Sequence, residues 1–201
     1  MAGRPRGVDD AVLLRHTAEV MGQVGPGGFT LAAVARAAGV VPATLVQRFG
    51  SKRGLLLALA RGSAEAADGR YERLRASYAS PLAALRALAE ETSAPMATPE
   101  SFANHLAFLC MDLADPELHE HALSVHRAQG RAIARLLDAA LEQGELRADA
   151  DPARLARSVQ AVIAGTGLTW ALDREGDLPQ RLREELADLL SPHVTTKTEE
   201  S

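Results

Sequence analysis

Cysteine and aromatic residues are scarce in this sequence: Cys110 is the only cysteine, and 3% of the 201 residues are aromatic. A single thiol excludes a disulfide within the chain and favours a reducing compartment. No apolar run approaches the roughly 20 residues that a membrane-spanning helix needs, and Met1 to Gly7 lack the apolar stretch of a signal peptide. We therefore expect a cytoplasmic protein without a membrane partner.

Catalytic and metal-binding motifs are missing as well. The sequence has no Gly-x-Ser-x-Gly elbow, phosphate-binding loop or Cys-x-x-Cys pair, so it predicts neither an enzyme nor a cofactor. His119 and His121 point about 200° apart on a helix, which argues against a metal site. A site that combines His119 with Glu120 or Asp115, as in a metal-dependent helical hydrolase, stays open. The four clustered histidines are His105, His119, His121 and His126.

The net charge of −4 conceals an uneven distribution of charge along the chain. Residues 1–62 carry about +5, whereas the remaining residues carry about −9. A basic end on an otherwise acidic chain favours a polyanionic partner for that end. The N-terminal part is therefore where a nucleic-acid contact is to be sought.

Helical periodicity covers nearly the whole chain, and no segment has the alternating pattern of a strand. We therefore expect an all-α fold of about nine helices, several of which have a proline near their first residue, where proline is tolerated. The polar residues 192–201 are expected to form a disordered tail. The first predicted helix starts at Asp9 or Asp10 and ends at Gly25-Pro26-Gly27-Gly28, and the others span 31–38, 42–49, 52–76, 81–94, 100–114, 116–143, 152–172 and 179–190.

The helices at 31–38 and 42–49 have the form of a helix-turn-helix, in which the second helix enters the major groove of DNA. Ala35 is small enough for the two helices to cross closely. Gly39 suits a turn that needs a positive φ, and Leu45 anchors the second helix from inside. This pattern predicts a DNA-binding motif.

Short segments around this motif follow one another in a distinctive order. They are Phe29-Thr30-Leu31, Ala35-x-x-x-Gly39-Val40, Thr44-Leu45-x-x-x-Phe49 and Ser51-Lys52-x-x-Leu55-Leu56. Over residues 9–60 this order resembles the TetR/AcrR family of bacterial transcriptional regulators, and the rest of the chain resembles that family in length and helical plan. The resemblance implies a DNA-binding domain at residues 1–55 and a ligand-binding and dimerisation domain at 56–191.

Two departures from the family pattern affect the expected DNA contacts. Val41 stands where many members have Ser or Thr, and Val46-Gln47-Arg48 replaces the common Tyr-His-Tyr. The usual aromatic phosphate contact is therefore absent at Val46, while Gln47 can read adenine and Arg48 can read guanine or hold phosphate. Lys52 at a helix start suits a phosphate.

The flexible basic arm around Pro5 can lie along the DNA backbone or in the minor groove. Together with the residues of the helix-turn-helix, it completes the set of candidate DNA contacts. They are Arg4, Arg6, Thr30, Pro42, Ala43, Thr44, Gln47, Arg48 and Lys52.

An effector pocket is expected among the fourth to eighth helices, and its aliphatic lining favours an apolar or amphipathic molecule. Cys110, beside Met111, is expected in the core. The expected lining residues are Leu88, Met96, Phe102, Leu106, Leu109, Cys110, Leu123 and Trp170. Apolar stripes on the last two helices, together with the family plan, predict a homodimer interface formed by Val159, Val162, Ile163, Gly167, Leu186, Leu189 and Leu190.

These features predict a ligand-responsive, homodimeric repressor that binds a pseudo-palindromic DNA operator. The alternative is an all-α small-molecule-binding or scaffold protein whose helix-turn-helix no longer binds DNA. Val41 and Val46 are the residues that favour this alternative. The two hypotheses differ in whether the chain binds DNA with an affinity that falls as salt is added.

Overall fold

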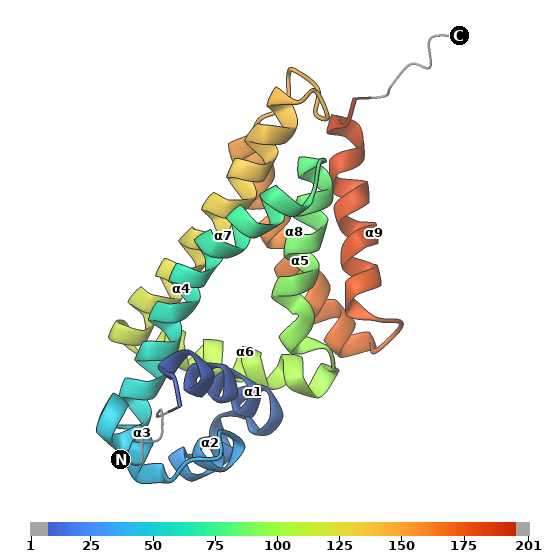
Figure 1. Cartoon of the computed structure of the whole chain (residues 1–201). Helices are drawn as coiled ribbons and strands as arrows, with labels where there is room; N and C mark the ends of the chain where they lie inside the picture. Colours follow the sequence, from blue (N-terminus) through green and yellow to red (C-terminus); the bar gives the residue numbers. More distant parts are fainter. Residues whose placement is uncertain (1–7, 196–201) are drawn as a thin grey trace.

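The computed structural model describes the chain from Val8 to Thr195, apart from the side chain of Asp68. Within these residues it contains nine α-helices and two short 3-10 helices (Figure 1), which confirms the all-α prediction. The elements are α1 (Asp10–Gly28), α2 (Leu31–Ala37), α3 (Pro42–Phe49), α4 (Lys52–Ser77), α5 (Pro81–Ser93), η1 (Ala94–Met96), α6 (Pro99–Ala114), α7 (Pro116–Glu142), α8 (Pro152–Asp173), α9 (Leu178–Leu190) and η2 (Ser191–His193).

Capping side chains explain where most of these α-helices begin. Each one except α3 follows a Ser, Thr or Asp whose side chain accepts a hydrogen bond from an amide of the first turn. Thr30 caps α2 in this way, as predicted, at 3.1 Å from the amide of Ala33. Val41 cannot cap α3, which begins instead at Pro42, whose fixed φ suits a first helical residue.

The glycine-rich segment that was predicted to end α1 does so at Gly28, and it also contains a kink. Gly25 has a φ of +63°, and one more helical turn follows it before α1 ends at Gly28. An added Cβ at Gly25 would lie 2.5 Å from Oδ1 of Asn104 on α6. The kink therefore needs glycine both for its backbone conformation and for the close approach of α6.

Two main cores divide the molecule into two regions. The N-terminal region, which comprises α1–α3 and the first turns of α4, packs around fully buried side chains such as Leu13, Val34 and Leu45. The C-terminal region, which comprises α5–α9 and the rest of α4, has a larger core centred on side chains such as Leu136 and Leu137. A smaller cluster around Trp170 joins α8 to α9.

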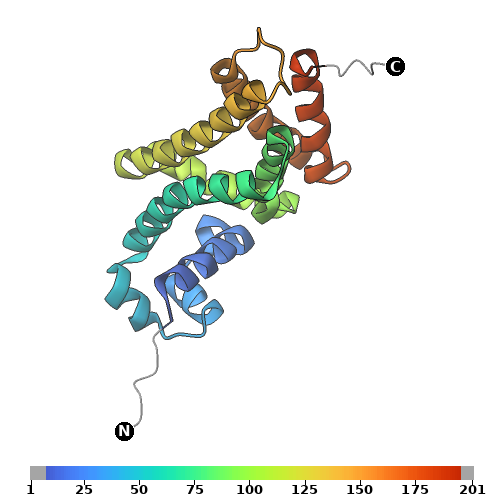
Figure 2. The same ribbon diagram turned by 45° about the horizontal axis from the view of Figure 1, so that its top comes forward.

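Two helices connect the regions. α4 leaves the N-terminal region and runs beside α7 in both views (Figures 1 and 2). α6 packs across α1, and its Phe108 is buried in the N-terminal core rather than in the C-terminal one. The position of the N-terminal region therefore depends on α4 and α6 together.

The first residues of the predicted disordered tail, 192–195, are ordered in the structure. Val194 forms an antiparallel bridge with Leu146, and the amide of Thr195 donates to the carbonyl of Glu145 at 3.0 Å. The loop between α7 and α8 supplies these backbone partners, which the sequence near the C-terminus does not reveal. Residues 196–201 lie outside the described residues.

Candidate nucleic-acid interface

The recognition helix α3 is attached to the protein by one side. Leu45 is its only fully buried residue, and it joins the core formed by α1, α2 and α4. On the other side Ala43 and Gln47 are exposed, and Val46 is 47% exposed. An α-helix with side chains is about 10–12 Å across, which matches the major groove of DNA. The structure thus leaves α3 free to enter such a groove.

The turn between α2 and α3 has the predicted geometry. Gly39 adopts a φ of +66°, and the amide of Val40 donates to the carbonyl of Ala35 at 2.9 Å. Ala35 is buried, as a close helix crossing requires. The roles predicted for Ala35, Gly39 and Leu45 are therefore confirmed, and the two helices form a helix-turn-helix.

Most of the predicted DNA contacts lie on the open side of this motif. Thr30, Pro42, Ala43 and Gln47 are exposed, and Thr44 is half-buried. The Thr30 hydroxyl oxygen already accepts the capping hydrogen bond, but its proton remains a donor. Arg4 and Arg6 lie outside the described residues.

Lys52 lies at the first residue of α4 with its ammonium 5.2 Å from the centre of the Phe29 ring. The buried Phe29 ring in turn meets Phe108 of α6 edge to face, with 5.5 Å between ring centres. The cation–π contact positions the ammonium of Lys52, and the partial positive charge of the α4 N-terminus adds to that of the ammonium, so that this point favours an anion. A change in the position of α6 would therefore reach the residue predicted to bind phosphate.

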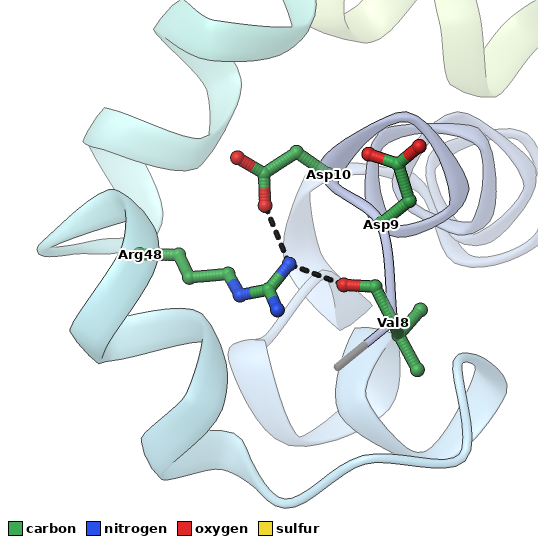
Figure 3. A pocket seen from close by; sticks show the side chains of 4 residues that line it. All are labelled: Val8, Asp9, Asp10 and Arg48. Atoms are coloured by element: carbon green, nitrogen blue, oxygen red, sulfur yellow. Dashed lines mark hydrogen bonds and ion pairs between the residues drawn. The ribbon is translucent and has the colours of Figure 1, made fainter. Parts of the chain in front are cut away.

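Arg48 is directed toward the start of α1 (Figure 3). Its Nη1 donates to the carbonyl oxygen of Val8 and to Oδ1 of Asp10, the latter at 2.6 Å. These contacts also border a shallow hollow lined by Val8, Asp9, Asp10 and Arg48. The structure thus gives the Arg48 guanidinium partners within the chain, in addition to any that DNA would supply.

One residue that the sequence did not single out is Arg53, the neighbour of Lys52. Its guanidinium makes two hydrogen bonds to the Asp115 carboxylate, at 2.6 and 2.9 Å, and contacts Glu117 at 2.6 Å. These hydrogen bonds raise the pKa of Arg53 and hold the pKa of Asp115 well below its usual range. Arg53, Asp115 and Glu117, here called the Arg53 cluster, tie the start of α4 to the start of α7.

Asp115 also caps α7, because its Oδ1 accepts from the amides of Glu117 and Leu118. The sequence Asp115-Pro116 reveals this capping role. It does not reveal Arg53 as a partner, because the two residues are 62 positions apart.

The predicted pocket residues do not converge on one site. Leu88 belongs to the main C-terminal core and Trp170 to the smaller cluster, which Phe102 contacts. Leu109 is exposed on α6, and so is Cys110, which corrects its expected place in the core. The reason is that several apolar side chains of α6 are exposed and pack into none of the cores. Of the other predicted residues, Leu106 is also exposed, and Met96 and Leu123 are partly buried.

Most residues of the predicted dimer interface pack inside the single chain. Val159, Leu186 and Leu190 are buried in the C-terminal core, and Val162, Ile163 and Leu189 pack against it. Gly167 faces the Phe102 ring, which lies 2.5 Å from the position of an added Cβ. The periodicity of α8 and α9 therefore marked the side that packs on their own neighbours.

The described residues also bear on metal binding and on membrane crossing. No three His, Cys, Asp or Glu side chains in this part of the chain come together in a way that suits a metal ion. His126 instead lies next to Gln160, whose side-chain amide donates to its carbonyl at 3.0 Å. None of the described helices has the length and apolar character that crossing a membrane requires.

An exposed recognition helix on a helix-turn-helix, joined to a larger helical region, defines the class of DNA-binding transcriptional regulators. Comparisons identify the family within this class. Residues 13–59 match the family of bacterial regulatory proteins called tetR, and residues 81–194 match the C-terminal part of BetI-type transcriptional repressors. The chain belongs to the TetR family of transcriptional regulators.

Solved structures with the same fold are numerous but distant in sequence. A TetR transcription regulator from Haloarcula marismortui has a TM-score of 0.73 at 14% identity, covering 92% of this chain and 98% of its own. A protein from Saccharomonospora viridis in complex with choline has a TM-score of 0.72 at 20% identity, covering 93% and 98%. Thermus thermophilus FadR, in complex with lauroyl-CoA, has a TM-score of 0.58 at 24% identity, covering 96% and 99%. A search of curated protein sequences finds no match.

Proposed function

We propose that this regulator is a cytoplasmic, homodimeric repressor that releases a pseudo-palindromic DNA operator when it binds an effector. The observation that carries the proposal is the exposure of α3, whose only fully buried residue is Leu45. Two such helices in a symmetric dimer would enter successive major grooves about 34–36 Å apart, or a multiple of that distance.

Base reading is assigned to α3 and phosphate binding to the start of α4. Gln47 is exposed and has no side-chain hydrogen bond within the described chain, so its amide is available to adenine. Thr44 can reach a base methyl group or a phosphate. Lys52 is held at a helix N-terminus, where the ammonium and the backbone amides both favour an anion. The Arg48 guanidinium instead contacts Val8 and Asp10 at the start of α1.

For the dimer we propose the outward side of α8 in place of the buried stripes. Five of its exposed residues recur at helical spacing and are small or apolar, and Leu172 is 76% exposed. Small residues permit helices of two subunits to approach closely, and the leucines supply apolar area. The residues of this surface are Ala161, Ala164, Gly165, Leu168 and Leu172.

An apolar or amphipathic effector suits α6, which exposes Leu106, Leu109 and Leu113. A quaternary ammonium such as choline is recognised mainly by aromatic faces, and these are few here. The Tyr71 ring already has the Arg135 guanidinium over it at 3.7 Å. We therefore expect lauroyl-CoA, the ligand of the FadR relative, to stabilise the chain against heat and release it from DNA, and choline to do neither. Stabilisation and release from DNA by choline, but not by lauroyl-CoA, would contradict an apolar or amphipathic effector.

The effector signal is proposed to travel from α6 to α4. The Phe108–Phe29–Lys52 contacts connect α6 to the end of α4 that adjoins α3. The Arg53 cluster connects the same end of α4 to the start of α7 at Asp115, which is also the C-cap of α6. An effector acts only by binding better to the conformation in which the two recognition helices miss the operator spacing. Replacing Phe108 by Leu should weaken the effect of the effector on DNA affinity more than it weakens effector binding.

The central test is selection of bound DNA from a pool of random duplexes, followed by affinity measurements at increasing salt. The proposal predicts enrichment of a pseudo-palindrome, with an affinity that falls steeply as salt rises. No enrichment, or an affinity that is insensitive to salt, would favour the alternative of a helical binding protein that no longer binds DNA.

A further inference from the structure

The outer surface of the recognition helix is largely apolar. Val46 is 47% exposed, and Val41, which directly precedes α3, is 64% exposed. Pro42 and Ala43 are exposed as well. We call these four residues the apolar surface of α3. Among the described residues, none of the four belongs to a hydrophobic cluster.

Val46 does little to stabilise the helix that carries it. β-Branched residues lose χ1 freedom in a helix and have a lower helix propensity than Ala, Leu or Gln. α3 has only eight residues, so its formation depends on packing, and packing is supplied by the buried Leu45 on the other side. A residue that favours neither the helix nor the core is expected where a surface serves binding.

The major groove of DNA offers an apolar side chain one kind of partner. The base edges present hydrogen-bond donors and acceptors there, and thymine also presents its C5-methyl group. An isopropyl group against a polar base edge would leave donors or acceptors without partners, which costs free energy. Against a thymine methyl group the same side chain buries apolar area. In the groove, Val46 therefore favours thymine.

The residue that follows Val46 indicates the same kind of base pair. Gln47 is exposed on α3, and its amide suits adenine, which pairs with thymine. Neighbouring residues of an α-helix differ in height by about 1.5 Å, whereas base pairs are about 3.4 Å apart. The two side chains therefore meet the same base pair or adjacent ones, so an A·T pair or A·T step satisfies both.

We propose that Val46 is a specificity-determining residue that contacts the 5-methyl group of thymine in each half-site of the operator. Ala43, one turn earlier on the same side of α3, extends the apolar contact. Reading by hydrogen bonds remains the role of Gln47. The proposal rests on the proposed function, because it names what the same interface reads. Val46, which replaces the aromatic phosphate contact common in the family, thus reads a base instead of the backbone.

The experiment replaces thymines one at a time in the duplex that the wild-type chain selects from a random pool. Deoxyuridine lacks the methyl group of thymidine and keeps its hydrogen-bonding groups. At one thymine of each half-site, uracil should weaken binding about fourfold per half-site, because the apolar area of one methyl group is no longer buried. The salt slope should stay unchanged, because no phosphate contact is lost.

The variant Val46→Ala tests whether this methyl group meets Val46. It should bind the thymine duplex about fourfold more weakly per half-site than the wild type does. At the sensitive position its affinities for thymine and uracil should differ by less than about 1.5-fold. The matched control is Val24→Ala on α1, because Val24 is 41% exposed, close to the value for Val46. This control should keep the full fourfold discrimination, and circular dichroism checks that both variants are folded.

Two results would overturn the role of Val46 while leaving the proposed function intact. One is a selected half-site in which no thymine is sensitive to loss of its methyl group, a measurement that needs no variant. The other is an equal sensitivity in the wild type and in Val46→Ala, which would mean that the methyl group acts through the shape of the DNA. Failure of the wild-type chain to bind any duplex would overturn the proposed function, and the role of Val46 with it.

Discussion

The two regions of the molecule differ in how firmly they hold their helices. In the N-terminal region α3 has eight residues and buries only Leu45, whereas α7 in the C-terminal region has 27 residues and buries seven. Helices as short as α3 are not stable alone, so tertiary contacts decide whether α3 forms and where it lies. A helix that must enter a DNA groove has to leave most of its surface uncovered. Its position therefore depends on few contacts, and small changes in them can move it.

The largest effect on stability is expected at Leu45, because the position of α3 depends most on this residue. Leu45→Ala should lower the free energy of unfolding by about 2–5 kcal/mol, because it removes the buried anchor of α3 and leaves a cavity. DNA binding should be lost with it. Chemical denaturation and a gel-shift assay measure the two effects. Val46→Ala, on the exposed side of the same helix, is the control and should leave stability almost unchanged.

In the C-terminal region, the largest effect on dimer formation is expected from a substitution on the outward side of α8. Leu168→Glu should prevent dimer formation, because two symmetry-related carboxylates would be buried together at a cost of several kcal/mol. Sedimentation velocity should then show a folded monomer. Leu113→Glu places the same charge on the exposed side of α6 and should leave the dimer intact. A dimer that tolerates Leu168→Glu would remove α8 from the interface.

Base reading by the N-terminal region is expected to depend on a single exposed amide. Gln47→Ala should relax the preference at one position of each half-site, with a loss of about 1–3 kcal/mol of discrimination. Competition between duplexes that differ at one base pair measures this loss. Base preference that is unchanged at every position would exclude Gln47 as a reading residue. Thr44→Ala serves as a comparison on the neighbouring turn of α3.

Phosphate binding at the start of α4 should show the opposite pattern. Lys52→Gln should weaken binding to all sequences alike and lower the salt slope by about 0.9 per subunit, because one phosphate contact is lost. Titrations at several salt concentrations test this. A loss confined to one operator sequence would contradict the assignment.

The smallest effect concerns the Arg53 cluster, which joins the two regions. The folded-state pKa of Asp115 lies below its ordinary value, so its ion pair stabilises the fold above about pH 4 and loses this effect as the pH falls further. Asp115→Asn keeps a side chain that can cap α7 but removes the charge. The variant should melt at a lower temperature than the wild type at pH 7, and this difference should shrink toward pH 2.

Asp149→Asn is the matched substitution inside one region, because Asp149 pairs with Arg147 two residues away. Asp149→Asn should leave DNA affinity unchanged, whereas Asp115→Asn should alter DNA affinity through α4. Equal effects of the two substitutions on DNA affinity would show that the Arg53 cluster does not couple the regions.

Local features of the sequence predicted the helix-turn-helix well. The capping role of Thr30, the positive φ of Gly39 and the burial of Leu45 depend on the residue itself and its immediate neighbours. In the C-terminal region the helix bounds were also predicted closely. The kink at Gly25 was not predicted, because Asn104, which leaves no room for a Cβ at this position, comes from far along the chain.

The roles of helix surfaces were harder to predict. An apolar stripe on α8 indicates that one side is buried, but burial against the same chain and burial against a second copy produce the same periodicity. Val159 and Leu186 therefore looked like interface residues and are core residues. Cys110 looked like a core residue and is exposed, because Phe108 is the only residue of α6 that is fully buried.

The sequence by itself thus determined the helices, their caps, the DNA-binding motif and the basic character of the N-terminal part. These properties arise from short-range periodicity, backbone preferences and charge, which operate within a few residues. Only the tertiary structure decided that Arg48 holds the start of α1 and that Arg53 holds the start of α7. Such partners are tens of residues apart, and their meeting depends on how whole helices pack together.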